Sequence, residues 1–142
     1  MMVSRIDALK TRIFVAQKKL PADLVLKNGR VVNVFTGRIG RADVAFSGGV
    51  IAAVGSDYFG VEEVSVEGRW IVPGFIDAHY HVESSMMIPS ELASALLLHG
   101  TTAIVADPHE IANVRGLEGI RFMLSESAGC PLDMFFMAPS CV

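Results

Sequence analysis

A regular alternation of strand-like and helix-like segments follows Pro73-Gly74, and it constrains the fold more than any other feature of the sequence. Apolar strand patterns alternate with longer helical patterns, each bounded by glycine or proline. The segments are a strand at 74–82, a helix at 89–100, a strand at 101–108, a helix at 116–129 and a strand at 131–142. This order is typical of a parallel sheet with crossover helices, so we predict an α/β fold.

The residues before Pro73 follow other patterns. Residues 4–19 place apolar side chains on one stripe and predict an amphipathic helix that Pro21 ends. Residues 22–72 contain short β-rich runs and predict a small, mostly antiparallel β unit. Its expected turns are at Asn28-Gly29, which favours a hairpin, at Gly48-Gly49 and at Glu67-Gly68.

Composition excludes several classes of protein. Hydrophobic residues make up 51% of the 142 residues and charged residues 19%, which is unlike a disordered tail. A net charge of −3 with scattered Lys and Arg argues against nucleic-acid binding. We find neither a membrane-spanning apolar run nor a secretory signal, so we expect a cytoplasmic protein. Cys130 and Cys141 are too far apart for a zinc C-x-x-C motif and are expected to pack as small apolar residues.

Two histidines and an aspartate recur at every second position of the first strand after Pro73. Side chains two apart share a face of a strand, which gives one set of Phe75, Asp77, His79 and His81 and an opposite set of Ile76, Ala78, Tyr80 and Val82. We expect a helix to cover the second set. His79 and His81 are the candidate ligands of one divalent metal, and Asp77 is the candidate for holding an imidazole in place. The alternative is a hydrogen-bonded pair of histidines without metal.

A second polar group follows the strand at 101–108. Asp107, His109 and Glu110 would lie at the same mouth of a parallel sheet as the histidine pair. They are candidates for binding a substrate, for carrying a proton (Asp107 and Glu110) or for holding an extra metal. Alternatively, Asp107 or Asn113 caps the segment that follows.

Other polar residues near the histidines carry weaker predictions. Glu83 continues the strand and is a candidate substrate contact, or else a hydrogen-bonding residue of the loop. Ser84 and Ser85 are expected to form loop hydrogen bonds more readily than substrate contacts. His99 precedes the helix-ending Gly100, where an imidazole suits the negative end of the helix dipole.

The motif "VPGFIDAHYH" resembles the first barrel strand of the amidohydrolase superfamily, whose members are metal-dependent hydrolases. The segments "HVESSMMIPSELA", "DPHEIANV" and "PLDMFFMAPSCV" are similar to those of the adenine deaminases of that superfamily. The resemblance implies a distorted TIM-like (β/α)8 barrel preceded by a composite β-sandwich. It thereby assigns an N-terminal helix to 1–21, a sandwich segment to 22–72 and the first three barrel strands to 73–142.

The same resemblance implies a chemistry. His79 and His81 match the metal ligands of the first strand, in a centre that is often binuclear and associated with manganese or iron. A metal-bound hydroxide would attack C6 of adenine, releasing ammonia and hypoxanthine in purine salvage. The partners so implied are adenine and water, without nucleic acid or membrane; a homo-oligomer is left open.

Three strands do not close a barrel, which needs about 200 residues or more. We therefore expect the chain to be the N-terminal portion of a longer enzyme and to be inactive by itself. Two alternatives remain at this point. The chain could belong to another cyclic-amide hydrolase, similar to a dihydroorotase, or it could be a small non-catalytic α/β binding module whose histidines are structural.

Overall fold

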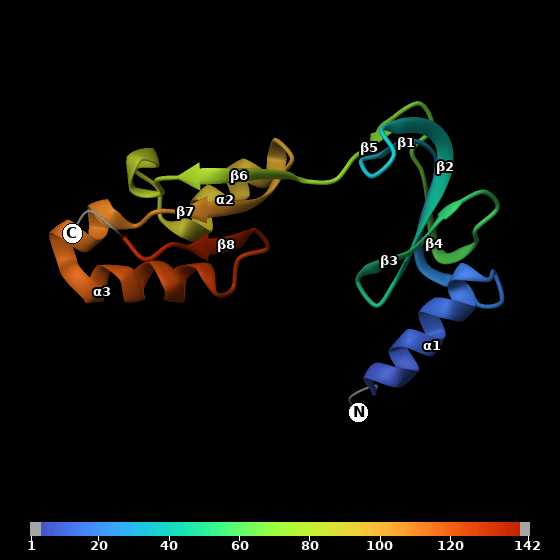
Figure 1. Ribbon diagram of the computed structural model, residues 1–142, viewed down its shortest axis with the longest axis horizontal. Helices are drawn as coiled ribbons and strands as arrows, with labels where there is room; N and C mark the ends of the chain where they lie inside the picture. Colours follow the sequence, from blue (N-terminus) through green and yellow to red (C-terminus); the bar gives the residue numbers. More distant parts are fainter. Residues whose placement is uncertain (1–3, 140–142) are drawn as a thin grey trace. The chain divides into compact units, whose positions relative to one another are not determined.

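The computed structural model describes residues 4–139, and the chain divides into two compact units, Met1–Pro73 and Gly74–Val142 (Figure 1). Each unit has its own sheet. The N-terminal unit contains α1 (Arg5–Ala16), β1 (Ala22–Asn33), β2 (Arg38–Ser47), β3 (Val50–Gly55), β4 (Gly60–Ser65) and β5 (Trp70–Ile71). The C-terminal unit contains β6 (Phe75–Tyr80), the 3-10 turn η1 (Glu83–Ser85), α2 (Pro89–Leu98), β7 (Thr101–Ala106), α3 (His109–Ser127) and β8 (Asp133–Phe136).

The predicted first helix is confirmed as α1. Ser4 is its N-cap, because the Ser4 hydroxyl accepts a hydrogen bond from the backbone N–H of Asp7 at 3.1 Å. Val15 is the one described helix residue that is fully buried, and it packs against β1 and β2. The apolar stripe that the sequence predicts for this helix is largely exposed, since Ile6 is 66% accessible and Leu9 is 55% accessible.

The sheet of the N-terminal unit has the order β3-β2-β1-β4, with β5 also paired to β1. The β1–β2 and β2–β3 pairs are antiparallel, whereas β4 and β5 both run parallel to β1. The prediction of a mostly antiparallel unit is therefore only half right. A hairpin signal marks neighbours in sequence, but it carries no information about later strands that return beside β1.

The predicted hairpin at Asn28-Gly29 is wrong, because β1 runs through these residues with a bulge. Asn28 has a φ of 60°, and its backbone N–H donates to Asp43 Oδ1 at 3.0 Å, which replaces a lost sheet bond. Gly29 is buried against Ile71 with no room for a Cβ. The hairpin instead forms after Asn33, whose side chain accepts from two turn amides.

The other two predicted turns of this unit are confirmed. Gly48 and Gly49 join β2 to β3 with φ values of 62° and 75°, the geometry that tight hairpins require. Gly68 has a φ of 77° in the turn that precedes β5.

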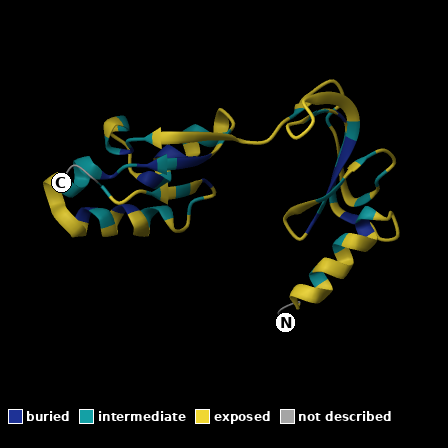
Figure 2. Cartoon of the chain, viewed as in Figure 1, coloured by how far each residue is buried: buried dark blue, intermediate teal, exposed yellow. Residues whose placement is uncertain are grey.

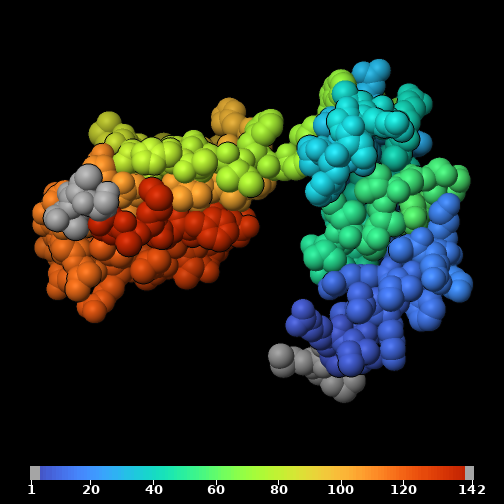
Figure 3. Space-filling view, in the orientation of Figure 1, coloured from blue at the N-terminus to red at the C-terminus, as the bar shows by residue number. Residues whose placement is uncertain are grey.

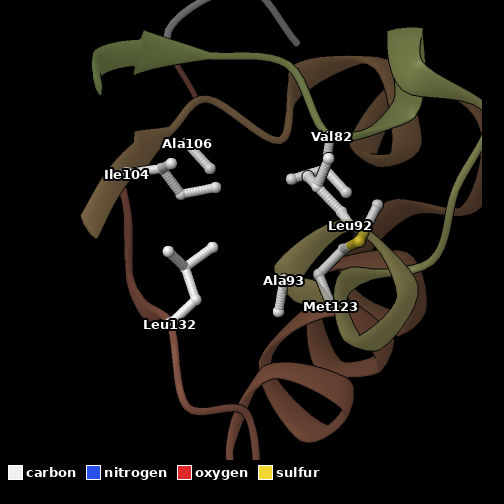
Figure 4. Close-up of a cluster of buried hydrophobic side chains, with 7 residues drawn as sticks. All are labelled: Val82, Leu92, Ala93, Ile104, Ala106, Met123 and Leu132. Atoms are coloured by element: carbon white, nitrogen blue, oxygen red, sulfur yellow. The ribbon is translucent and has the colours of Figure 1, made fainter. Parts of the chain in front are cut away.

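The C-terminal unit confirms the predicted alternation of strands and helices. Its sheet has the order β6-β7-β8, and both pairs are parallel. Helix α2 packs against both β7 and α3, and side chains of the strands, loops and both helices form the core (Figure 4). The buried side chains of this core are Val82, Leu92, Ala93, Ile104, Ala106, Met123 and Leu132. Burial of each large member contributes about 1.5–3 kcal/mol to folding.

Strand β6 is far more exposed than predicted (Figure 2). We expected a helix to cover Ile76 and Ala78, yet Ile76 is 69% accessible and Ala78 is also exposed. Only the end of that set is covered, with Tyr80 half-buried and Val82 buried. The reason is that α2 packs against β7 rather than against β6. In addition, β6 is an edge strand of the sheet among the described residues.

Helix α3 begins earlier than predicted. The sequence predicted a helix at 116–129 and assigned no helix to 109–115, but the helix extends from His109 to Ser127 across a kink. Gly116 interrupts the helix with a φ of 58° and a ψ of −143°. The short first part therefore places His109 and Glu110 on a helical turn rather than on a loop. Neither Asp107 nor Asn113 occupies its N-cap position, which belongs to Pro108.

The structure describes one of the two cysteines, Cys130. Cys130 packs against the core of the C-terminal unit, as expected, and its thiol donates to the carbonyl of Glu126 at 3.2 Å. Cys141 lies outside the described residues. Among the described helices none is long and apolar enough to cross a membrane.

Candidate metal centre

The imidazole rings of His79 and His81 face each other at the end of β6. Their Nε2 atoms are 3.0 Å apart, and the rings are nearly perpendicular, at 82°. A metal ion holds imidazole nitrogens at about 2.0–2.1 Å, so two neighbouring ligands of one ion lie about 3 to 3.4 Å apart. The pair therefore fits a shared divalent cation with little movement, although a direct hydrogen bond has the same distance.

The opposite nitrogen of His81 supports the metal interpretation. His81 Nδ1 lies 3.2 Å from the backbone carbonyl oxygen of Asp107, and a carbonyl can only accept a hydrogen bond. The proton of a neutral His81 is then on Nδ1, which leaves the Nε2 lone pair directed at His79. Metal-binding histidines commonly have such a partner behind them, which fixes the tautomer and the ring orientation.

Asp77 makes a different contact from the expected one. Its Oδ1 accepts a hydrogen bond from the backbone N–H of His79 at 3.1 Å, so it holds the main chain rather than an imidazole. The pairing register of β6 with β7 shifts between Asp77 and Tyr80. Simple alternation therefore does not run through the whole strand, and it does not by itself place Asp77 on the face of His79.

The start of α3 brings a third imidazole to this group. His109 and His81 have ring centroids 4.9 Å apart, with the rings nearly perpendicular at 86°. His109 Nδ1 lies 3.4 Å from Asp107 Oδ2, but the two are not aligned for a hydrogen bond. His109 Nδ1 and Asp107 Oδ1 are both buried atoms without a hydrogen-bond partner. Such atoms are costly to bury, which is typical of groups that bind something.

Two hydrogen bonds tie the loop after β6 to the start of α3. Glu83 Oε1 accepts from the backbone N–H of Ile111 at 3.0 Å, so this carboxylate caps the helix from another segment. The Ser84 hydroxyl donates to Glu110 Oε1 at 2.9 Å. These bonds join the two polar groups that the sequence placed at the ends of β6 and β7. Sequence reasoning missed the pairings because they connect residues 26 and 28 positions apart.

Ser85 and His99 do not join this group. The Ser85 hydroxyl donates to the carbonyl of Val82 at 2.6 Å and accepts from the backbone N–H of Met87, so it shapes the loop as predicted. His99 is exposed at the C-cap of α2.

Ligand atoms of His81, His109 and Glu110 all lie within 4.8 Å of one another. Each of these residues is half-buried. Two imidazoles and one carboxylate are a common ligand set for divalent first-row metals. The geometry defines a candidate metal centre at the carboxyl ends of two neighbouring parallel strands.

A parallel sheet with a candidate divalent-metal site at the carboxyl ends of its strands fits a hydrolase of the amidohydrolase class. The match to the Amidohydrolase family spans residues 70–142, which are more than half of the chain. The chain belongs to that family.

Its relatives are similar over nearly the whole chain. It is 51% identical to an adenine deaminase of Listeria monocytogenes over 141 residues, which are 99% of this chain and 24% of the relative. It is 52% identical to an adenine deaminase of Geobacillus kaustophilus over 136 residues, 96% of this chain and 23% of the relative. The chain thus spans about a quarter of the length of these curated relatives.

Solved structures share the fold at lower sequence identity. A D-aminoacylase structure, described as defining a novel subset of amidohydrolases, matches with a TM-score of 0.65 and 22% identity over 84% of this chain and 30% of that one. A second D-aminoacylase structure, concerned with the role of its binuclear metal centre, matches with the same TM-score and 24% identity over the same shares.

Proposed function

We propose that this chain is part of an enzyme that converts adenine and water into hypoxanthine and ammonia. The observation that carries the proposal is about 50% identity to adenine deaminases along 99% of the chain, and that span includes the histidine pair. We further propose that the reaction serves purine salvage in the cytoplasm, with adenine and water as the small-molecule partners.

In this proposal His79 and His81 hold a divalent cation through their facing Nε2 atoms. A bound divalent cation supplies a nucleophile at neutral pH, because coordination lowers the pKa of water from about 15.7 to about 7. The chain's own contribution is orientation, since the Asp107 carbonyl keeps the His81 tautomer that binds a cation. We propose manganese or iron as the metal, in a binuclear centre completed by residues outside this chain.

Replacing the amino group at C6 of adenine with oxygen requires proton transfers. A proton must leave the attacking water, and the departing amine must gain one. Asp107 is our candidate for this transfer, because its Oδ1 is buried without a partner beside the histidines. Glu110 is a second candidate. Hydrogen bonds between carboxylates and the purine ring nitrogens would hold the base in place.

We propose that β6, β7 and β8 are the first three strands of a (β/α)8 barrel. Support comes from the parallel order and from the exposed side chains Phe75 and Phe135, which are 61% and 60% accessible. Both β6 and β8 reach the surface of the C-terminal unit (Figure 3). Further strands would cover them, and the sheet of the N-terminal unit would form part of a composite β-sandwich. The isolated 142-residue chain is then inactive.

The test is an assay of the full-length gene product and of the 142-residue chain on two substrates. Ammonia and hypoxanthine should appear from adenine with the full-length protein only, and a chelator should stop the reaction. Preferential hydrolysis of dihydroorotate would assign the enzyme to the cyclic-amide hydrolases instead. A well-folded full-length protein that holds no divalent ion and turns over neither substrate would favour a non-catalytic binding module.

A further inference from the structure

We infer that the start of α3 is part of the metal centre, with His109 and Glu110 as cation ligands beside His79 and His81. This inference rests on the proposed metal-dependent function. It selects metal binding by the first turn of α3 from the roles that the sequence left open for these residues, which were substrate binding, proton transfer and holding an extra metal. The ligand class is a divalent first-row cation such as manganese, iron or zinc.

The first observation is the position of His109. Its ring packs against that of His81 at 4.9 Å between centroids. His81 in turn directs Nε2 at His79, so the three imidazoles form one continuous group. Three imidazoles in contact are repelled from one another as cations but are drawn together by a shared metal.

The second observation is the unpartnered ring nitrogen of His109. Nδ1 is buried, and the nearest carboxylate oxygen, Asp107 Oδ2, is 3.4 Å away without hydrogen-bond alignment. A small rotation would let Asp107 accept the Nδ1 proton and leave the His109 Nε2 lone pair for a cation. A carboxylate behind a ligating histidine is a recurring arrangement in metal sites.

The third observation is that Glu110 is already oriented. The Ser84 hydroxyl holds one carboxylate oxygen at 2.9 Å, so the second oxygen keeps its lone pairs for another partner. Glu83 fixes the same helical turn through the backbone of Ile111. A carboxylate held by an outside hydrogen bond loses less conformational freedom on binding a cation than a free surface carboxylate does.

The distances require only a modest closure. Two ligands on opposite sides of an ion at about 2.1 Å are at most about 4.2 Å apart, and the atoms of His81, His109 and Glu110 lie within 4.8 Å of one another. The most widely separated of these atoms would have to approach each other by about 0.6 Å or more to bind one ion.

The experiment measures cation retention in the full-length gene product. Wild type and the variants His109→Ala and Glu110→Gln are loaded with Mn²⁺, dialysed against graded chelator and analysed for metal per chain. Cobalt-substituted samples give an independent visible spectrum of the ligand set. Matched controls are His99→Ala and Glu91→Gln, which remove an exposed imidazole and an exposed carboxylate of α2.

We expect His109→Ala and Glu110→Gln to release cation at least about 10- to 100-fold more readily than wild type, the loss that removing a hydrogen-bond partner of a ligand already causes, with an altered cobalt spectrum. Glu110→Asp should recover part of the retention, because it restores a carboxylate. The controls should behave as wild type, and a thermal melt of each variant establishes that it is folded.

Two results would overturn the inference, and they are distinguishable. If both variants retain cation and the cobalt spectrum of wild type but lose adenine turnover, the two residues contact substrate and the proposed function stands. If wild type itself retains no cation and releases no ammonia, the proposed function fails as well.

Discussion

The Nε2 atoms of His79 and His81 face each other at 3.0 Å, while Nδ1 of His81 lies 3.2 Å from the backbone carbonyl oxygen of Asp107. The pair therefore joins two strands, because the carbonyl comes directly after β7 and the histidines come from the end of β6. A site built across two parallel strands depends on their register, and it is held by main-chain geometry as well as by side chains.

Replacing either histidine should remove the metal. We expect His79→Ala and His81→Ala in the full-length protein to lose most bound divalent ion and at least about 10²-fold in adenine turnover, because the nucleophile depends on the ion. Metal content and ammonia release are measured on the same samples. The control is His99→Ala, whose imidazole is exposed at the end of α2. Full metal content in both histidine variants would mean that the pair is a structural hydrogen bond.

The histidine pair was predictable because it depends on local spacing. Side chains two apart on a strand are close whatever the rest of the fold does, so His79 and His81 could be paired from sequence. The Glu83–Ile111 and Ser84–Glu110 bonds could not, since they depend on where α3 begins. That start was misjudged because Gly116 was taken as the first residue of the helix, whereas it lies at a kink inside it.

The N-terminal sheet shows the same limit. Gly48-Gly49 was predicted correctly because two residues with positive φ leave few alternatives to a tight turn. Asn28-Gly29 carries an equally strong local signal, yet it forms a bulge. The buried Asp43 carboxylate accepts the Asn28 amide, and Ile71 of a later strand packs on Gly29. Those partners are distant in sequence, and tertiary contacts override the local preference.

The bond from Glu83 to the start of α3 should stabilise that turn. Glu83→Ala removes the acceptor of the Ile111 amide, and loss of a helix cap costs about 0.5–2 kcal/mol. We expect faster amide hydrogen exchange confined to residues 109–115. Glu83→Gln retains an acceptor and is the matched control, with a smaller change. Equal exchange in wild type and in the alanine variant would show that the carboxylate does not hold the helix.

The Lys27–Asp43 pair should make the stability of the N-terminal unit depend on pH. The amine and carboxylate are 2.9 Å apart, and the Asp43 side chain is only 6% accessible. Burial by itself would raise the pKa of Asp43, but hydrogen bonds from Lys27, Asn28 and Tyr58 and the Lys27 charge outweigh it and hold that pKa below 3.8. The hydrogen bond to Asp43 raises the pKa of Lys27 above 10.5, against the opposing effect of burial.

The lowered pKa of Asp43 and the raised pKa of Lys27 determine how the stability of this unit changes with pH. The Asp43 contribution is present above pH 3.8 and is lost as the pH falls through the lowered pKa. The Lys27 contribution is present below pH 10.5 and is lost as the pH rises through the raised pKa. Stability should therefore be flat near neutrality and fall at both extremes. Fluorescence of Trp70, the single tryptophan, reports unfolding of this unit in the 142-residue chain.

Asp43→Asn should cost about 2 kcal/mol at neutral pH. This is below the 3–5 kcal/mol for breaking a fully buried pair, because the Lys27 side chain is 23% accessible. The acid decline in stability should also become shallower. The matched control is Glu67→Gln, which removes an exposed ion pair with Arg41 at 3.8 Å and should change stability by no more than about 0.5 kcal/mol. An unchanged acid decline in Asp43→Asn would assign the effect to other carboxylates.

Gly116 should determine where the start of α3 lies. Its φ of 58° and ψ of −143° are strained for any residue with a Cβ, at a cost of about 1–3 kcal/mol. Beyond the kink, the helix folds back so that Gly119 packs tightly on Ile111. We expect Gly116→Ala to lower the melting temperature of the full-length protein and to weaken cation retention by displacing His109. Gly129→Ala is the matched control, since Gly129 has no neighbour near its Cβ position and does not have a positive φ. A Gly116→Ala variant with wild-type melting and retention would show that the kink has no part in positioning the site.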